Sequence, residues 1–130
     1  MLEVHHIGVL VDDIETSLRM YQGLFGEDDI TGPYTISSQG VRVSFLKMNK
    51  GYLEFVEAVG ESSILDMMKK RKVKYYHVGY LTASVEKAIE SLVERDFKHV
   101  ATFDSEAFDG RPCAFLFSPE MHLVELIESA

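Results

Sequence analysis

The chain has 130 residues, of which 46% are hydrophobic and 26% charged, and its formal net charge at pH 7 is −8. This length fits one globular domain with a core of its own, and the acidic balance argues against nucleic acid or an anionic membrane as a partner. No apolar run approaches the roughly 20 residues of a membrane span, the first residues do not resemble a signal peptide, and a single cysteine favours a reducing cytoplasm.

The first half of the chain is predicted to be β-α-β-β-β. After an apolar first strand, a helix is expected with Asp12 as its N-cap and Glu15 in the capping-box position, and Gly26 is expected to end it. Residues 49–51, Asn-Lys-Gly, are a hairpin turn signal between the last two strands. The predicted strands cover residues 4–11, 34–37, 41–45 and 52–56.

The second half is predicted to repeat this order after a linker helix at about residues 61–72. Ser84 is the predicted N-cap of its helix, whose apolar residues follow helical spacing. Turns are expected at residues 108–110 and 118–120. The predicted strands cover residues 74–81, 97–103, 111–117 and 122–127.

Polar residues of the first half recur in the second half at a constant offset of 71 (77 − 6 = 71). The repeated pairs are His6 and His77, Gly8 and Gly79, Glu54 and Glu125, and Glu57 and Glu128. Two copies of one supersecondary unit stack or pair, because neither buries its apolar face alone. Core packing would repeat valines and leucines, so repeated His and Glu side chains on otherwise apolar strands indicate a function.

Two of these pairs place a His on the first strand and a Glu on the last strand of each half. If the halves pair about a pseudo-two-fold axis, His6, Glu54, His77 and Glu125 converge on one point. Two imidazoles and two carboxylates suit a divalent metal such as Zn, Ni, Co or Mn. Any one of these residues alone is better explained as a hydrogen-bonded histidine or a solvated glutamate. Their common offset favours the metal site.

The chain resembles the vicinal oxygen chelate superfamily, which includes glyoxalase I and methylmalonyl-CoA epimerase. The resemblance spans essentially the whole chain and implies an α+β fold. Two paired βαβββ modules, at about 1–59 and 73–130 of a single domain over 1–130, would form an open cup around a shared metal. The family's metal positions fall on His6, Glu54, His77 and Glu125. The resemblance is carried by His-His-Ile-Gly (5–8), Asp-Asp-Ile-Glu (12–15), Gln-Gly-Val-Arg-Val (39–43), Leu-Glu-Phe-Val-Glu (53–57), Tyr-His-Val-Gly (76–79) and Val-Glu-Leu-Ile-Glu (124–128).

Within the superfamily, the epimerase branch is the most similar, through the strand at 39–46 and the linker at 61–65. The Asp-Pro-Asp-Gly hairpin of glyoxalases is absent, and residues 118–121 stand in its place. The chain also departs from epimerases, which often have His where this chain has Tyr76 and have a Lys-containing turn at 118–120. Some epimerases carry a Glu proposed as a base at the position of Val43.

The resemblance therefore implies a metal-dependent isomerase that abstracts a proton alpha to a carbonyl, in the manner of methylmalonyl-CoA epimerase. Two substrate oxygens bind the metal in this superfamily, and the metal stabilises the resulting anion. Because Val43 offers no base, we expect Glu125 or Glu54 to act both as ligand and as base.

Two other functions remain open. One is a glyoxalase-I-like lactoylglutathione lyase, which uses the same four ligands on a hemithioacetal. The other is a metal-free drug-binding protein of the bleomycin-resistance type, which has no need of the four ligands together. The expected partner is thus a small molecule, an acyl-CoA thioester or a hemithioacetal, and a homodimer is compatible with the family.

Four further polar features lie outside the repeated His and Glu pairs. The basic cluster at residues 69–74 would either attract an anionic substrate or complement the C-terminus of the linker helix, and the second reading is favoured. Strand alternation places His5 on the face opposite His6, in a structural role. His99 is expected to be exposed, and His122 to lie near the mouth of the site.

Overall fold

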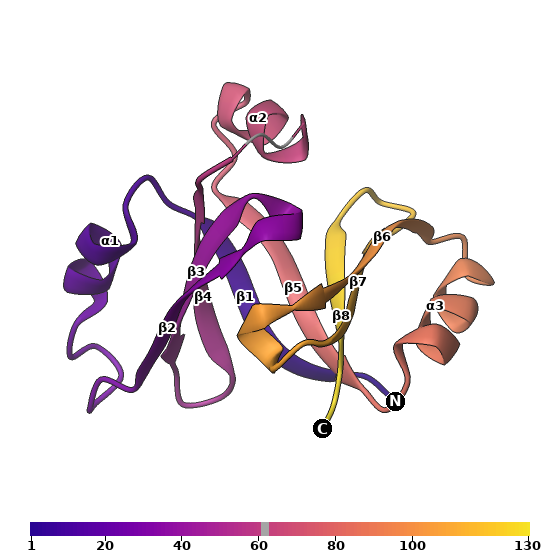
Figure 1. The fold of residues 1–130 in the computed structure, drawn as a ribbon, viewed down its shortest axis with the longest axis horizontal. Helices are drawn as coiled ribbons and strands as arrows, with labels where there is room; N and C mark the ends of the chain where they lie inside the picture. Colours follow the sequence, from indigo (N-terminus) through magenta and orange to yellow (C-terminus); the bar gives the residue numbers. More distant parts are fainter. Residues whose placement is uncertain (61–62) are drawn as a thin grey trace. The chain divides into compact units, whose positions relative to one another are not determined.

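The computed structural model describes residues 1–60 and 63–130 and confirms an α+β fold in which the order strand, helix, strand, strand, strand occurs twice (Figure 1). In chain order its elements are β1 (Glu3–Leu10), α1 (Ile14–Tyr21), β2 (Ile30–Ile36), β3 (Val41–Lys47), β4 (Tyr52–Ala58), α2 (Ser63–Lys70), β5 (Tyr75–Thr82), α3 (Val85–Val93), β6 (Lys98–Ser105), β7 (Arg111–Phe117) and β8 (Leu123–Glu128). Short 3-10 helices follow β2 (Ser37–Gln39) and β6 (Glu106–Phe108). None of the described helices has the length and apolar character needed to cross a membrane.

The chain forms two compact units. We call Ile7–Tyr76 the N-terminal unit, and Met1–His6 with His77–Ala130 the C-terminal unit. The division passes through β1 and β5, so each of these strands contributes residues to both units. The sequence repeat instead assigns β1 wholly to the first module and β5 wholly to the second.

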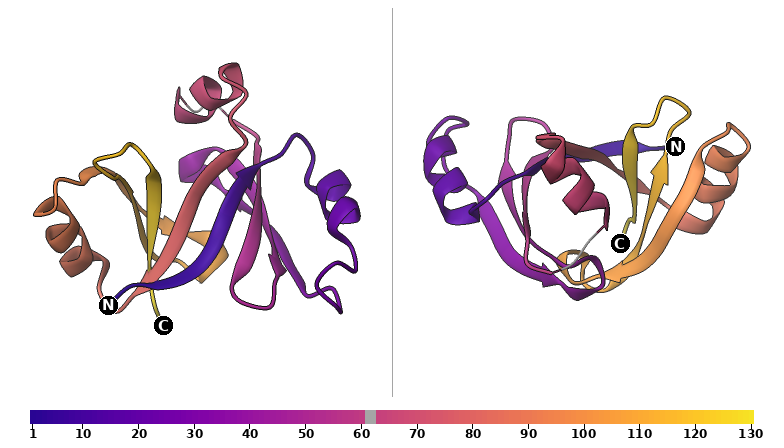
Figure 2. Two further views of the ribbon diagram at one scale, coloured as in Figure 1. Left: turned by 180° about the vertical axis from the view of Figure 1, so that it is seen from behind. Right: turned by 90° about the horizontal axis from the view of Figure 1, so that it is seen from above.

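In the N-terminal unit, the strand order is β2-β3-β4-β1, with antiparallel pairing of β2 to β3 and of β3 to β4. Helix α1 packs on β3 and β4, as the views in Figures 1 and 2 agree. Its Ile14 is buried with Leu46, Leu53 and Phe55. Because neighbouring side chains on a strand alternate between faces, Glu54 faces away from this helix-side core.

In the C-terminal unit, the strand order is β1-β5-β8-β7-β6. Strand β5 pairs parallel with β8, and β7 pairs antiparallel with both β8 and β6. Helix α3 packs on β6, β7 and β8 (Figure 2). Val85 at the start of α3 is buried with Leu116 and Leu126. The opposite face of β8 is therefore available for Glu125, one residue before Leu126.

The predicted start and end of α1 are wrong in detail. The N-cap is Asp13, not Asp12, because the Asp13 carboxylate accepts a hydrogen bond from the backbone N–H of Thr16 at 3.0 Å. A hydrogen bond from the Thr16 hydroxyl is the largest cause of a lowered pKa of Asp13, and the hydrogen bond from the Thr16 N–H is the second. Glu15 does not complete a capping box and pairs with Arg42 at 3.0 Å. The helix ends at Tyr21, four residues before Phe25 and well before Gly26.

The second helix start and the turns agree better with the predictions. Ser84 is the N-cap of α3 and accepts a hydrogen bond from the Lys87 N–H at 3.2 Å. The hairpin turn closes with the Met48 N–H donating to Gly51 O at 3.0 Å. The linker helix is confirmed as α2, although positions 61 and 62 of the prediction lie outside the described residues.

The strand predicted at residues 34–37 is wrong in extent. Strand β2 begins at Ile30, because an irregularity between Thr31 and Tyr34 lets the pairing with β3 continue past Gly32 and Pro33. Residue 37 already belongs to the 3-10 helix that follows. The other strand ends lie within one or two residues of the predictions.

The repeated pair Glu57 and Glu128 serves the fold. Glu57 accepts a hydrogen bond from the Ile14 N–H at 3.0 Å, and Glu128 accepts one from the Val85 N–H at 3.1 Å. Each carboxylate thus holds the first residue of a helix, where free N–H groups and the helix dipole favour negative charge. For this pair, the inference that repeated polar residues indicate a function is wrong.

We expect Glu128→Ala to destabilise the protein by about 1 kcal/mol, as the loss of a helix-capping acceptor does elsewhere. Glu128→Gln should cost about half as much, because the amide oxygen still accepts the Val85 N–H while the charge is lost. Urea unfolding of the chelator-treated protein measures both. Equal stabilities of the Ala and Gln variants would show that the hydrogen bond at the helix start is not what Glu128 contributes.

Candidate metal centre

Three strands of the C-terminal unit carry the predicted ligands His6, His77 and Glu125. His6 lies on β1, His77 on β5 and Glu125 on β8, and these strands are consecutive in the sheet. The three residues are 0%, 2% and 4% exposed, respectively. Parallel pairing sets Gly79 opposite Glu125, which brings the end of the carboxylate side chain beside the histidine rings.

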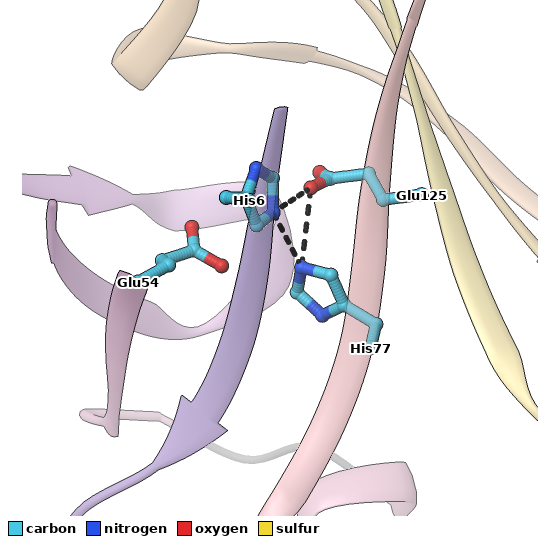
Figure 3. Close-up of side chains that lie close together, drawn as sticks. All are labelled: His6, Glu54, His77 and Glu125. Carbon is cyan, nitrogen blue, oxygen red and sulfur yellow. Dashed lines mark hydrogen bonds and ion pairs between the residues drawn. The ribbon is translucent and has the colours of Figure 1, made fainter. Parts of the chain in front are cut away.

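The ligand atoms of these three side chains form a small triangle (Figure 3). His6 Nε2 lies 2.8 Å from His77 Nε2, and Glu125 Oε1 lies 3.1 Å from His6 Nε2 and 3.3 Å from His77 Nε2. Ligand atoms about 2.0–2.2 Å from one ion stand roughly 3.0–3.5 Å apart at octahedral or tetrahedral angles. The spacing and the donor set therefore fit a divalent metal ion.

The environment keeps Glu125 ionised. Burial by itself raises the pKa of this carboxyl, but hydrogen bonds from His6 and His77, together with their charges, outweigh burial and lower the pKa to about 2. A ligand must be deprotonated to bind a metal. Glu125 is therefore in its ligand form at any neutral pH.

Gly79 makes room for the ring of His6. A Cβ at this position would overlap His6 Cε1 and would lie 2.5 Å from Nδ1 and 2.6 Å from Nε2. No side chain larger than hydrogen fits there while the ring keeps its place. The repeat marked Gly79, but only the structure reveals this role.

Aromatic neighbours also hold the histidine rings. Phe108, in the 3-10 helix after β6, is stacked on His6 with centroids 6.3 Å apart and meets the edge of His5 at 5.2 Å. Phe115 meets the ring of His77 at 5.4 Å. Phe108 carries no signal in the sequence, because it has no repeated counterpart and stands in a predicted turn.

The prediction that places His5 away from His6 is wrong. The Nδ1 atoms of the two adjacent rings are 2.9 Å apart. Backbone alternation separates the Cβ atoms, but both imidazoles turn toward Phe108 and so meet at their ends.

Glu54, the fourth predicted ligand, lies on β4 in the N-terminal unit and is also drawn in Figure 3. It is 3% exposed and pairs across the ladder with Phe45 of β3. Val43, which lies on β3 like Phe45, is 1% exposed, and its side chain cannot accept a proton. Glu54 and Glu125 are thus both deeply buried carboxylates.

The other polar residues singled out in the sequence lie on the surface. His99 and His122 are exposed, and the His99 ring contacts the Thr102 hydroxyl at 2.7 Å. The basic cluster at 69–74 is exposed at and after the end of α2, where cations complement the helix C-terminus. A second acidic group, Asp13 with Glu15 and Glu57, is engaged with the start of α1 and with Arg42.

Three solved structures illustrate what the chain is similar to. A hypothetical protein from Bacillus halodurans is 26% identical, with a TM-score of 0.84 over 99% of this chain and 95% of its own. A methylmalonyl-CoA epimerase in complex with methylmalonyl-CoA is 22% identical, with a TM-score of 0.83 over 100% and 96%. A Streptomyces coelicolor methylmalonyl-CoA epimerase variant in complex with 2-nitronate-propionyl-CoA is 22% identical, with a TM-score of 0.81 over 98% and 94%.

Among curated proteins, none matches the chain significantly. The family model that matches is described as the Glyoxalase/Bleomycin resistance protein/Dioxygenase superfamily, and it matches residues 5–115. This range runs from within β1 to within β7 and includes His6, Glu54 and His77. The chain therefore belongs to the glyoxalase/bleomycin resistance protein/dioxygenase superfamily.

Proposed function

We propose that the chain is a metal-dependent isomerase that removes a proton alpha to the carbonyl of an acyl-CoA thioester, most like methylmalonyl-CoA epimerase. The buried triangle of His6, His77 and Glu125 carries this proposal. A chain that only sequesters a drug has no need of two imidazoles and a carboxylate converging in its interior. The structural likeness to epimerases with acyl-CoA ligands supports the substrate class.

The proposed ligands are His6, His77 and Glu125, with Glu54 as the fourth. Burial of a carboxylate that is 3% exposed is favourable only with strong partners, and a divalent ion is one such partner. Zn, Ni, Co or Mn would suit two imidazoles and two carboxylates. When bound, the ion supplies Lewis-acid stabilisation of the enolate formed from the substrate.

The two glutamates are the proposed proton carriers, and their environments differ. With a pKa lowered to about 2, the Glu125 carboxylate is a weak proton acceptor at neutral pH, which suits a ligand. We therefore assign the first proton transfer to Glu54. Epimerisation also needs a proton delivered to the opposite face of the substrate, and Glu125 is the proposed second carrier. Because Glu125 holds no proton at neutral pH, it would first take one from a water molecule, and the proton held by Glu54 would then return to the hydroxide that is left.

The proposed function is tested by proton exchange. We expect the protein loaded with Co, Ni, Zn or Mn to exchange the alpha proton of methylmalonyl-CoA in D2O above the uncatalysed rate, as followed by proton NMR. EDTA should abolish the exchange, and returning the metal should restore it. The matched control is the same metal without protein.

Each other outcome has a distinct meaning. Metal binding without exchange rejects this thioester and favours the glyoxalase-type alternative, which is then tested with the hemithioacetal of methylglyoxal and glutathione. Failure to bind any of the four metals rejects the metal-dependent proposal and favours the drug-binding alternative.

A further inference from the structure

We propose that His5 is a positioning residue that fixes His6 in the tautomer and orientation needed to bind the metal. The inference rests on the proposed metal site and adds a residue that the superfamily resemblance does not assign. It follows from three contacts around one imidazole ring, all within the C-terminal unit.

The first contact fixes the proton. His6 directs Nε2 toward His77 and Glu125, so Nε2 must present its lone pair to a metal. The remaining proton of a neutral imidazole then sits on Nδ1. His6 Nδ1 is 2.9 Å from His5 Nδ1, so the His6 N–H donates and the His5 nitrogen accepts. In the reverse arrangement, His5 donates and the His6 proton moves to Nε2, where it blocks the metal.

The other two contacts fix the plane of the ring. The backbone at Gly79 lies against one edge of the His6 ring, so closely that a Cβ would overlap it. The Phe108 ring is stacked on His6 with an interplanar angle of 18°, and it also meets the edge of His5. His6 is completely buried, so it has little space to turn. Hydrogen bonds that hold a ligating histidine in this way typically contribute 10–100-fold to metal affinity.

Two variants separate hydrogen bonding from packing. His5→Asn keeps an acceptor close to the position of Nδ1, whereas His5→Leu keeps similar bulk against Phe108 but removes the acceptor. His99→Leu makes the same chemical change at an exposed histidine on β6 and is the matched control.

We would measure the Zn²⁺ affinity of each variant by competition with a chromophoric chelator, and the His6 Nδ1–H signal by long-range ¹H–¹⁵N NMR of the zinc-loaded protein. We expect His5→Leu to weaken zinc binding 10–100-fold and to lose the slowly exchanging Nδ1–H signal. His5→Asn should stay within about threefold of the unmodified protein and retain the signal. His99→Leu should change neither quantity.

Three results would overturn the inference. Unchanged zinc binding in His5→Leu would show that the contact has no influence, and equal weakening in both His5 variants would indicate packing alone. If the unmodified protein binds no zinc, there is no metal for His5 to orient His6 toward, and the inference is overturned. If zinc binds but alpha-proton exchange is absent, the proposed function fails, while the effect of His5 on zinc affinity still tests the inference.

Discussion

Glu125→Gln is expected to fold normally and to lose metal binding and alpha-proton exchange together. The amide has nearly the shape of the carboxylate but lacks the negative charge that favours binding of a divalent ion. Because Glu125 Oε1 lies 3.1 Å and 3.3 Å from the two histidine nitrogens, the loss falls at the centre of the site. We expect at least a 100-fold loss of zinc affinity, since removal of a ligand exceeds the effect of removing a supporting hydrogen bond.

Glu54→Gln provides the informative comparison. If Glu54 is both fourth ligand and first proton acceptor, exchange should fall at least 100-fold at saturating zinc, while zinc affinity falls less than in Glu125→Gln. Glu120→Gln makes the same change at an exposed turn residue before β8 and should alter neither quantity. Near-normal exchange in Glu54→Gln with saturating metal would contradict the assignment of Glu54 as the base. Retained zinc affinity in Glu125→Gln would contradict the role of Glu125 as a ligand.

The sequence repeat selected residues that lie close together, but it did not distinguish what each repeated residue does. An offset of 71 selects His6 and His77, which the structure brings to 2.8 Å, but it equally selects Glu57 and Glu128. Duplication copies the requirements of the fold together with those of a site, and a helix start needs an acceptor for its N–H groups as much as a metal needs a ligand. Spacing alone does not distinguish these two requirements.

The errors in the sequence analysis have local causes. Asp12 and Asp13 are both good N-caps, and only the hydrogen bond to Thr16 decides between them. The position of His5 was inferred from backbone alternation, which does not describe where the end of a long ring lies. The division of β1 and β5 between two compact units is not such an error, because the repeat makes no statement about it; it depends on contacts between residues far apart in the sequence. Pattern and periodicity contain no information about such contacts.

Gly79→Ala is expected to impair the metal site more than the fold. The backbone of Gly79 does not adopt the left-handed conformation that only glycine favours, so alanine is excluded by contact and not by backbone strain. The three atoms nearest to its methyl group would all belong to the His6 ring. The ring must therefore move, and its surroundings hold it on the other sides through Phe108, His77 and His5. Added bulk in such a core typically costs about 1–3 kcal/mol.

Two measurements decide the origin of this effect. Zinc affinity should fall at least 100-fold, because a displaced His6 no longer presents Nε2 beside His77 and Glu125. Gly60→Ala adds the same methyl group where the nearest atom is 3.4 Å away, and it should leave zinc affinity unchanged. In urea unfolding of the metal-free protein, Gly79→Ala should cost stability in the unmodified background but not beside His6→Ala, since that change removes the ring. Additive effects of the two substitutions would show that Gly79 is required for a reason other than the His6 imidazole.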